Sequence, residues 1–508
     1  MNVDLVNRRE EMGLPFCLLC AAVLVVTVFL LLLSTYGDFW LVPWHDEVVI
    51  ARLAQNLTEG RGFRNDFLDD LLPSADERTY WQMPVYPFAL SIWGKFFGFE
   101  LNSLRWFSRI CGAVTITLLF ALTVKLRLSA TAILLSVLWT ATDLNFQFAS
   151  NFVRPDILTC SLLLAATLFL VHKPLTSWHC LLAGLSAALS VFSHPIALPC
   201  WLVCGAIIVK RNGWRDGAIF VLPFLIGLSA WLFYGLQDWH AFTGQLKAHA
   251  LHKSYPIPHR LAFLLGTTFW GIQHYLGIPL NAMPWCAVIL AFVWVSWREK
   301  GRMFLPRWLV LFAAALYAIV AVGAEAWYPA LFVPFGYLIL AAMVWLMTEK
   351  ATTKTVKALL MVAALGWWVY QARVVFLHVS ALPEIRRQTM SFVRDLERRL
   401  PERAVVLIGS FSPDPTFALL NSRSDLKFYQ LMPSPMVDPV ALKKLRNRLT
   451  HLLVLEEAVK EPLLSGQKLR SWHFDFGGLT QPPHRGVTIV LLKVPRVSQQ
   501  PSNSKPTG

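Results

Sequence analysis

Residues 15–47 read PFCLLCAAVLVVTVFLLLLSTYGDFWLVPWHDE, an apolar run that is soon followed by two adjacent carboxylates. A helix needs about 20 mostly apolar residues to cross a bilayer, and the run from Pro15 to Tyr36 is long enough. It lacks a small-residue cleavage site, so we expect a retained span rather than a signal peptide. The stretch predicts a membrane protein whose first outer loop carries Asp46 and Glu47.

Similar apolar runs recur along the chain. Its mean hydropathy is +0.50 and only 15% of its residues are charged, against about 25% in soluble proteins. We expect a polytopic α-helical membrane protein with about eleven transmembrane helices. The glycine-broken stretch 261–280 is expected at the interface, with a twelfth span as the alternative. The predicted spans are 15–36, 104–124, 129–146, 157–172, 178–194, 196–209, 217–235, 283–297, 306–323, 330–347 and 357–377.

The net charge of +15 does not predict a nucleic-acid site. The basic residues stand in small groups between the apolar runs, without a zinc-finger or aromatic-interleaved basic motif, so no nucleic acid is expected. Lys and Arg gather in alternate loops, as on the cytoplasmic side of membrane proteins. We therefore expect a cytoplasmic N-terminus and, with an odd number of spans, a C-terminal region outside. These loops hold Arg8, Arg9, Lys125, Arg127, Lys173, Lys210, Arg211, Arg215, Arg298, Lys300, Arg302, Arg307, Lys350, Lys354 and Lys357.

Two long loops are predicted on the outer face, at 37–103 and 236–282. Long loops in compact proteins are usually functional or disordered. The first loop has helical apolar spacing at 45–58, and an aromatic-rich amphipathic segment at 86–99 is expected to lie on the membrane. This order favours a site at the membrane surface.

The chain changes character after the predicted transmembrane domain, residues 1–378. Residues 379–495 are expected to form a small soluble α/β domain outside the membrane, followed by a disordered tail at 496–508. A charged amphipathic helix is expected at 384–400. Strands are predicted at 404–409, 451–455 and 487–494. The eight cysteines all lie in apolar segments, which predicts neither a disulfide scaffold nor a zinc site.

The motif Trp44-His45-Asp46-Glu47 is the strongest candidate for chemistry. Adjacent carboxylates beside a membrane are costly to bury without partners. In one interpretation Asp46 caps a helix at 47–58 and Glu47 lies on its dipole. In the other, the pair acts as a general base or metal ligand that faces a cavity at the membrane.

Cationic residues near the outer face form two more candidates. Arg154 and Asp156 begin the fourth span, where the guanidinium either binds a phosphate or only anchors the helix through an Arg–Asp pair. A later outer loop offers Lys247, Lys253 and Arg260, either to a lipid phosphate or to lipid headgroups in general. Its histidines lack acidic neighbours, so no metal and no required cofactor is expected, with a divalent cation as the alternative.

Three single residues near membrane boundaries complete the set. His194 lies between the fifth and sixth spans, and Glu325 and Tyr328 lie at the outer end of the ninth. An ionisable side chain there is a functional candidate. A helix-end cap is the alternative for His194, and an interfacial acid is the alternative for Glu325.

Several motifs together resemble a known family. Asp46-Glu47 opens the outer loop, and further motifs follow in order at 84–87, 105–112, 154–156 and 327–334. Over roughly residues 15–350 this resembles the bacterial branch of the dolichyl-phosphate-mannose–protein mannosyltransferase family. Those enzymes have the GT-C membrane fold and include the lipid A aminoarabinose transferases. The motif residues are Pro84, Tyr86, Pro87, Arg105, Ser108, Gly112, Arg154, Pro155, Asp156, Tyr328, Pro329 and Pro334.

The resemblance implies an activity and a location. It implies transfer of a hexosyl or pentosyl group from a polyprenyl-phosphate carrier to a protein, lipid or glycan acceptor. The reaction would take place on the periplasmic face of a bacterial inner membrane. Asp46 corresponds to the family's catalytic acid. We expect Glu47 to act with it as an orienting partner, and we expect Tyr86, Arg105 and Asp156 to be among the substrate-binding residues.

One motif departs from the aminoarabinose branch, which has Glu-Lys-Pro-Pro where this chain has Trp-Gln-Met-Pro at 81–84. The lysine that would contact the carrier phosphate is missing. Arg154, Lys247, Lys253 or Arg260 is then expected to take up the phosphate.

The chemistry needs few groups. A polyprenyl phosphate is a good leaving group, so one carboxylate as base and one cation at the phosphate suffice for a single displacement with inversion.

A transporter or flippase without glycosyl transfer is the main alternative function, and a structural partner in envelope assembly is a third interpretation. Because the ionisable groups cluster at the outer ends of the spans rather than mid-span, the sequence favours surface chemistry.

Overall fold

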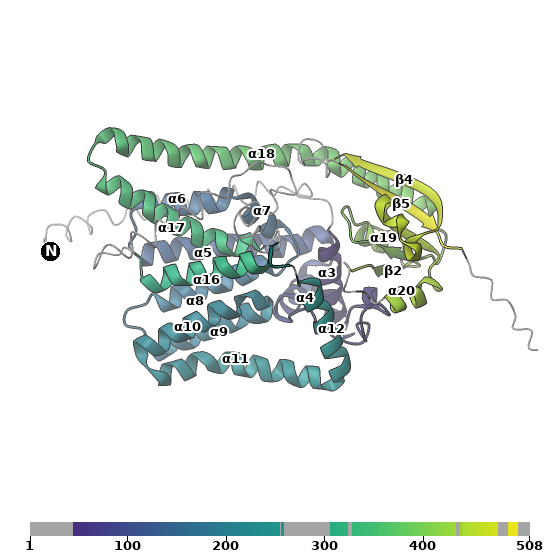
Figure 1. Ribbon diagram of the computed structural model, residues 1–508, viewed down its shortest axis with the longest axis horizontal. Helices are drawn as coiled ribbons and strands as arrows, with labels where there is room; N and C mark the ends of the chain where they lie inside the picture. The colour runs from purple at the N-terminus through teal and green to yellow at the C-terminus, as the bar shows by residue number, and fades with distance from the viewer. Residues whose placement is uncertain are drawn as a thin grey trace, which may run out of the picture.

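The computed structural model describes residues 44–254, 256–258, 305–323, 328–432, 437, 439–475 and 486–495. A layered bundle of helices and a smaller sheet lie at opposite ends of the long axis of the molecule (Figure 1). The predicted spans at 15–36 and 283–297, the stretch 261–280 and the tail 496–508 lie outside the described residues.

Apolar helices form the bundle. Within the described ranges, four helical stretches are long and apolar enough to cross a membrane, and a fifth if the bent pair α7–α8 counts as one span. The prediction of several membrane-crossing helices is confirmed, whereas the number eleven stays a prediction. The bundle also contains shorter helices, and its elements are α5 Leu101–Lys125, α6 Ala130–Thr142, α7 Leu144–Asn151, α8 Asp156–Leu170, α9 Ser177–Ser193, α10 Leu198–Asn212, α11 Trp214–Gly235, α16 Arg307–Gly323 and α17 Pro329–Lys350. The more polar α12 Trp239–His252 follows α11.

The predicted span at 129–146 is wrong, because the chain breaks at Asp143. The Asp143 carboxylate accepts hydrogen bonds from the backbone N–H groups of Asn145 and Phe146, at 2.8 and 3.1 Å, and so starts α7 anew. The hydroxyl of Tyr337 donates to the other carboxylate oxygen, at 2.9 Å. A second break follows at once, since α7 and α8 are bent by 110°. Residues 152–155 form this bend, and Arg154 lies in it.

The helix α18, Lys354–Arg399, joins the bundle to the sheet (Figure 1). The sequence predicted a span at 357–377 and a separate helix at 384–400. The structure instead has one helix of 46 residues that continues through Pro383. The prediction of two helices is therefore wrong, although both predicted segments are helical.

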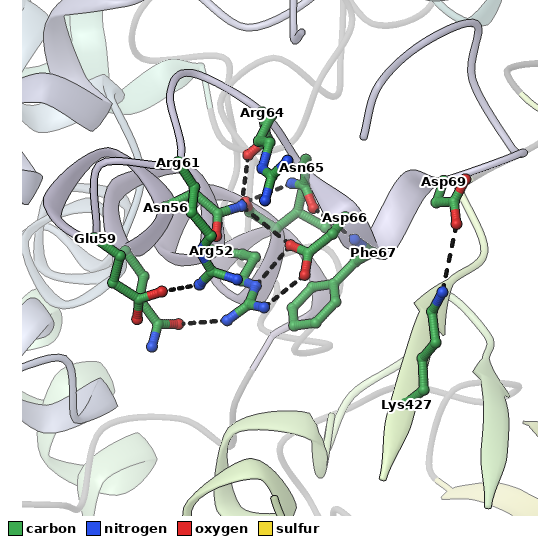
Figure 2. A network of polar contacts seen from close by, with 12 residues as sticks. Arg52, Asn56, Glu59, Arg61, Arg64, Asn65, Asp66, Phe67, Asp69 and Lys427 are labelled. Atoms are coloured by element: carbon green, nitrogen blue, oxygen red, sulfur yellow. Dashed lines mark hydrogen bonds and ion pairs between the residues drawn. The ribbon is translucent and has the colours of Figure 1, made fainter. Parts of the chain in front are cut away.

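The loop predicted to be the first outer one is ordered over its described residues, 44–103, around α3 His45–Thr58 and α4 Val85–Phe97. Asp66 begins the short helix η2 Asp66–Leu68 and links it to α3. Its carboxylate accepts two hydrogen bonds from Arg52, at 2.7 and 2.5 Å, and one from Asn56, at 3.0 Å (Figure 2). Burial alone would raise the pKa of Asp66, but the hydrogen bonds and charge of Arg52 lower it to about 2.

The C-terminal region contains a five-stranded sheet of order β2-β1-β3-β5-β4. The strand β1 runs parallel to β2 and β3, whereas β5 runs antiparallel to β3 and β4. The predicted strands at 404–409, 451–455 and 487–494 are present, and β2 and β4 were not predicted. The elements are β1 Val405–Ile408, α19 Thr416–Ser422, β2 Lys427–Gln430, α20 Pro439–Arg446, β3 His451–Leu455, β4 Gln467–Asp475 and β5 Gly486–Lys493, with short 3-10 helices η3 Pro195–Ala197, η4 Leu236–Asp238, η6 Glu456–Lys460 and η7 Pro462–Leu464.

The sheet packs directly on the first outer loop. Val48 and Ala51 of α3 belong to the same buried cluster as Phe411 and Phe417 beside β1. Apolar burial contributes about 25 cal/mol per Å², so this shared core is expected to hold the two regions together. Ionic contacts reinforce it: Asp69 and Asp70 lie within 4 Å of Lys427, Lys444 and Arg448; Figure 2 shows Asp69 facing Lys427.

Candidate functional site

Asp46 and Glu47 lie in the first turn of α3 but in different surroundings. The side chain of Asp46 is 38% exposed, whereas that of Glu47 is fully buried. Successive helical residues point about 100° apart, so one carboxylate faces outward and its neighbour faces the core. The two acids are therefore not equivalent.

Glu47 joins three parts of the chain. Its carboxylate accepts hydrogen bonds from Nε and Nη2 of Arg105 in α5, at 2.9 and 2.6 Å. It also accepts from the backbone N–H of Val153, at 3.0 Å, and of Trp44, at 3.0 Å. Trp44 is the N-cap of α3, so the interpretation of Asp46 as the cap is wrong. Glu47 instead bonds the cap residue's N–H, which fixes the start of the helix.

Arg154 lies between two carboxylates. Its Nε donates to Asp156, at 2.9 Å, and its Nη1 forms an ion pair with Asp46. Arg154 is 8% exposed and Asp156 is 1% exposed. The predicted Arg–Asp contact is thus present, and the guanidinium also reaches the exposed acid of α3. The two carboxylates therefore share one guanidinium.

Aromatic and cationic side chains gather around Tyr328, just before α17. The ring of Tyr328 meets the His194 ring edge-on at 5.0 Å, and the Lys253 ammonium lies 5.9 Å from its centroid. Tyr328 also lies in the neighbourhood of Arg154. His194 accepts a hydrogen bond from the N–H of Ile196, at 3.3 Å, so it also caps η3. The structure thus brings together residues that the sequence placed in four separate segments.

Other predicted residues have structural partners or lie apart. Tyr86 is fully buried and its hydroxyl is 2.9 Å from that of Ser108. Arg105 stacks on Phe152 at 5.4 Å in addition to its contact with Glu47. Lys247 is exposed on α12. Arg260 and Glu325 lie outside the described residues. In the part of the chain that the structure describes, no group of three His, Cys, Asp or Glu residues could hold a metal ion.

The sequence analysis missed one buried pair beside the site. The ring of His45 is 1% exposed, and its Nδ1 lies 3.8 Å from the carboxylate of Asp414 in the C-terminal region. His45 belongs to the motif at 44–47, but nothing in the surrounding sequence indicates that its ring is buried. Asp414 lies in a loop without a recognisable motif.

Comparisons with known proteins agree with this architecture. Residues 82–234 match the family model described as dolichyl-phosphate-mannose-protein mannosyltransferase. The comparison with curated proteins finds no match. Among solved structures, the chain resembles ArnT from Cupriavidus metallidurans bound to undecaprenyl phosphate. The TM-score is 0.55 at 12% identity, over 94% of this chain and 98% of that one.

A second fold match comes from an archaeon. It is the Archaeoglobus fulgidus oligosaccharyltransferase in complex with Zn and sulfate, with a TM-score of 0.50 at 13% identity over 86% of this chain and 68% of that one. The chain therefore shares the fold of these two membrane proteins, and its described residues include several helices that are long and apolar enough to cross a membrane. The family model supports the resemblance to the mannosyltransferase family over residues 82–234, whereas the bacterial branch stays a prediction.

Proposed function

We propose that this protein is an integral membrane glycosyltransferase that moves a sugar from a polyprenyl-phosphate carrier to an acceptor. One observation carries the proposal: the half-exposed Asp46 carboxylate is held by Arg154 at the end of a bundle with the GT-C fold. An oriented, accessible carboxylate is what a general base needs. The ArnT structure with undecaprenyl phosphate supports a lipid-linked donor.

The reaction would be a single displacement with inversion. An acceptor hydroxyl loses its proton to the Asp46 carboxylate as its oxygen attacks the anomeric carbon. The bond between that carbon and the phosphate oxygen breaks, and the polyprenyl phosphate leaves with the bonding electrons. No cofactor is required in this scheme, because the phosphate is already a competent leaving group.

Arg154 takes a different role from the phosphate clamp that the sequence predicted. Its Nε and Nη1 face the carboxylates of Asp156 and Asp46, so its charge is already compensated within the group. We assign it to orienting the base. Asp156, buried and bonded to the guanidinium, would hold Arg154 in turn.

The leaving phosphate then needs another cation. The Lys253 ammonium lies 5.9 Å from the ring centroid of Tyr328, and Tyr328 in turn lies in the neighbourhood of Arg154. We assign Lys253 to the phosphate, with Lys247 and Arg260 as further basic residues from the same segment. Glu47, Arg105 and Tyr86 are buried and bonded within the protein, so we assign them to positioning rather than to substrate contact.

The proposed location follows the basic residues of the loops. The N-terminus would lie in the cytoplasm of a bacterium, and residues 379–495 in the periplasm beside the inner membrane. The site at the start of α3 would then face the periplasm, where the acceptor is a protein, lipid or glycan. Residues 1–378 would form the transmembrane domain.

A transfer assay tests the proposal. Purified protein in lipid vesicles is given radiolabelled polyprenyl-phosphate sugars and an envelope extract as acceptor. We expect labelled product from the wild type, and a loss of about 10²- to 10⁴-fold in Asp46→Asn. Glu59→Gln, which removes an exposed carboxylate on the same loop, is the matched control.

Two results would contradict the proposal. One is near-normal turnover by Asp46→Asn at wild-type protein yield. The other is labelled carrier that crosses the vesicle bilayer unchanged, without any sugar transferred. The second result would favour the transporter or flippase.

A further inference from the structure

The carboxyl ends of the parallel strands face the start of α3. β1 ends at Ile408 and β2 at Gln430. The loop after β1 carries Asp414, which reaches His45 in the first turn of α3. In open α/β sheets this edge is where functional contacts gather. Here the edge meets the helix that carries the candidate base.

Asp414 is part of a fully enclosed polar cluster. One carboxylate oxygen accepts from the backbone N–H and the hydroxyl of Thr416, at 2.8 and 2.5 Å. The other accepts from the Gln430 amide, at 3.1 Å, and lies 3.8 Å from Nδ1 of His45. Each of the four residues is at most 1% exposed. The carboxylate is therefore held in one orientation by its own region.

Within this cluster, the buried ring of His45 depends on Asp414 for a polar contact. Both of its ring nitrogens are buried and lack a hydrogen bond among the described residues. Burying a polar ring without a bond costs free energy, and the nearby Asp414 carboxylate offsets part of this cost by attracting the Nδ1 side. The contact thus favours one placement of the helix start.

Three consecutive residues of α3 are each held by a different part of the chain. His45 faces Asp414 of the C-terminal region, Asp46 pairs with Arg154, and Glu47 is bonded to Arg105. Both sequence neighbours of Asp46 are therefore held, each by a different part of the chain. A change in either neighbour would turn or shift the carboxylate.

We propose that Asp414 is a positioning residue for the transfer reaction. Through His45 it fixes the first turn of α3 and hence the direction of the Asp46 carboxylate. This inference rests on the proposed function for its effect on turnover, but not for its effect on the helix. It gives the C-terminal region a part in catalysis without contact with the reacting atoms.

Hydrogen exchange measures the helix effect without any substrate. The full-length protein carrying Asp414→Asn is compared with wild type in detergent micelles. We expect faster amide exchange in the peptide that covers 44–50 and unchanged exchange in α5. His45→Asn should give the same pattern, which covers the case in which one variant folds poorly. Glu456→Gln, at an exposed ion pair of the same region, is the control.

Kinetics measure the effect on the reaction. Displacements of about 1 Å at a reacting centre cost up to about 10²-fold in rate, so we expect kcat of Asp414→Asn to fall about tenfold. KM for the donor should change less than about twofold, since no substrate contact is lost. Because both residues act through one contact, the double variant should be no slower than the slower single variant.

The outcomes separate the two proposals. Wild-type exchange at 44–50 in both variants, or independent losses that multiply in the double variant, would overturn the role of Asp414. A wild-type protein that transfers no sugar would instead overturn the proposed function. In that case, hydrogen exchange would still show whether Asp414 fixes the first turn of α3 through His45.

Discussion

The Arg105 guanidinium and the Glu47 carboxylate face each other through two hydrogen bonds, of 2.9 and 2.6 Å, where neither side chain is more than 6% exposed. Charges buried in this way must be matched, because removing one partner leaves the other uncompensated in a low-dielectric setting. The pair joins α3 to α5 and so connects the outer loop to the bundle.

Glu47→Gln should therefore destabilise the protein by about 3–5 kcal/mol. The amide keeps the shape of the side chain but leaves the Arg105 charge unmatched. Thermal unfolding in detergent, followed by tryptophan fluorescence, measures the change. Glu59→Gln removes an exposed pair with Arg61 and should cost at most about 1 kcal/mol. Equal melting temperatures for both variants would show that the buried pair contributes no more to stability than the exposed one.

Arg154→Lys distinguishes orientation of the base from phosphate binding. Lysine keeps the charge but cannot bond Asp46 and Asp156 through one planar fork. If Arg154 orients Asp46, kcat should fall by about 10-fold or more while KM for the donor changes little. A large rise in KM for the donor at unchanged kcat would instead indicate that Arg154 binds the carrier phosphate.

Lys253→Met removes the ammonium beside Tyr328 and keeps most of the apolar stem. If Lys253 binds the carrier phosphate, KM for the donor should rise about tenfold, because a charge-assisted contact contributes roughly 1.5–3 kcal/mol. Steady-state transfer assays at several donor concentrations measure it. Lys460→Met in the C-terminal region is the control. Identical donor dependence in both variants would exclude Lys253 from the phosphate site.

Asp66 should make the outer loop acid-sensitive. Its folded pKa of about 2 lies below the unfolded value of about 3.9, so its stabilising contribution is present above the unfolded pKa. That contribution is lost as the pH falls through the folded value. Melting temperatures between pH 7 and 3 should thus fall less steeply for Asp66→Asn than for the wild type.

Asp76 in the same loop provides the control of opposite sign. Burial and the nearby Asp69 raise its pKa, so its ionisation opposes folding at neutral pH. Asp76→Asn should consequently raise the melting temperature at pH 7. If both variants follow the wild-type profile, neither carboxylate governs the acid response.

Local sequence patterns predicted much of the fold. Periodic apolar residues were enough for α3, α4 and the long helices of the bundle, because each of these is specified within its own segment. They failed at Asp143, which is the only charged residue between Arg127 and Arg154 and looks like a tolerated polar position within an apolar helix. Its tertiary partner Tyr337 lies far along the chain, so the broken helix was not foreseeable.

The candidate site shows the same limit. The motifs supplied Asp46, Arg154, Tyr328 and Lys253, and the structure brings these residues together. The pairing of Arg154 with Asp46 spans 108 positions, and no spacing rule predicts a contact of that kind. The sequence also could not show that Glu47 is buried while Asp46 is partly exposed. The two residues are adjacent acids, and only the tertiary packing distinguishes their surroundings.

Because α18 is one continuous helix, the number of residues in it determines the position and rotation of the sheet relative to the bundle. At 1.5 Å per residue its 46 residues form a rod about 70 Å long. Inserting a single residue would advance everything beyond it by about 1.5 Å and rotate it by about 100°. A sheet that must meet the outer loop at fixed contacts does not tolerate such a turn. Point substitutions along the rod should therefore accumulate in related chains far more readily than insertions or deletions.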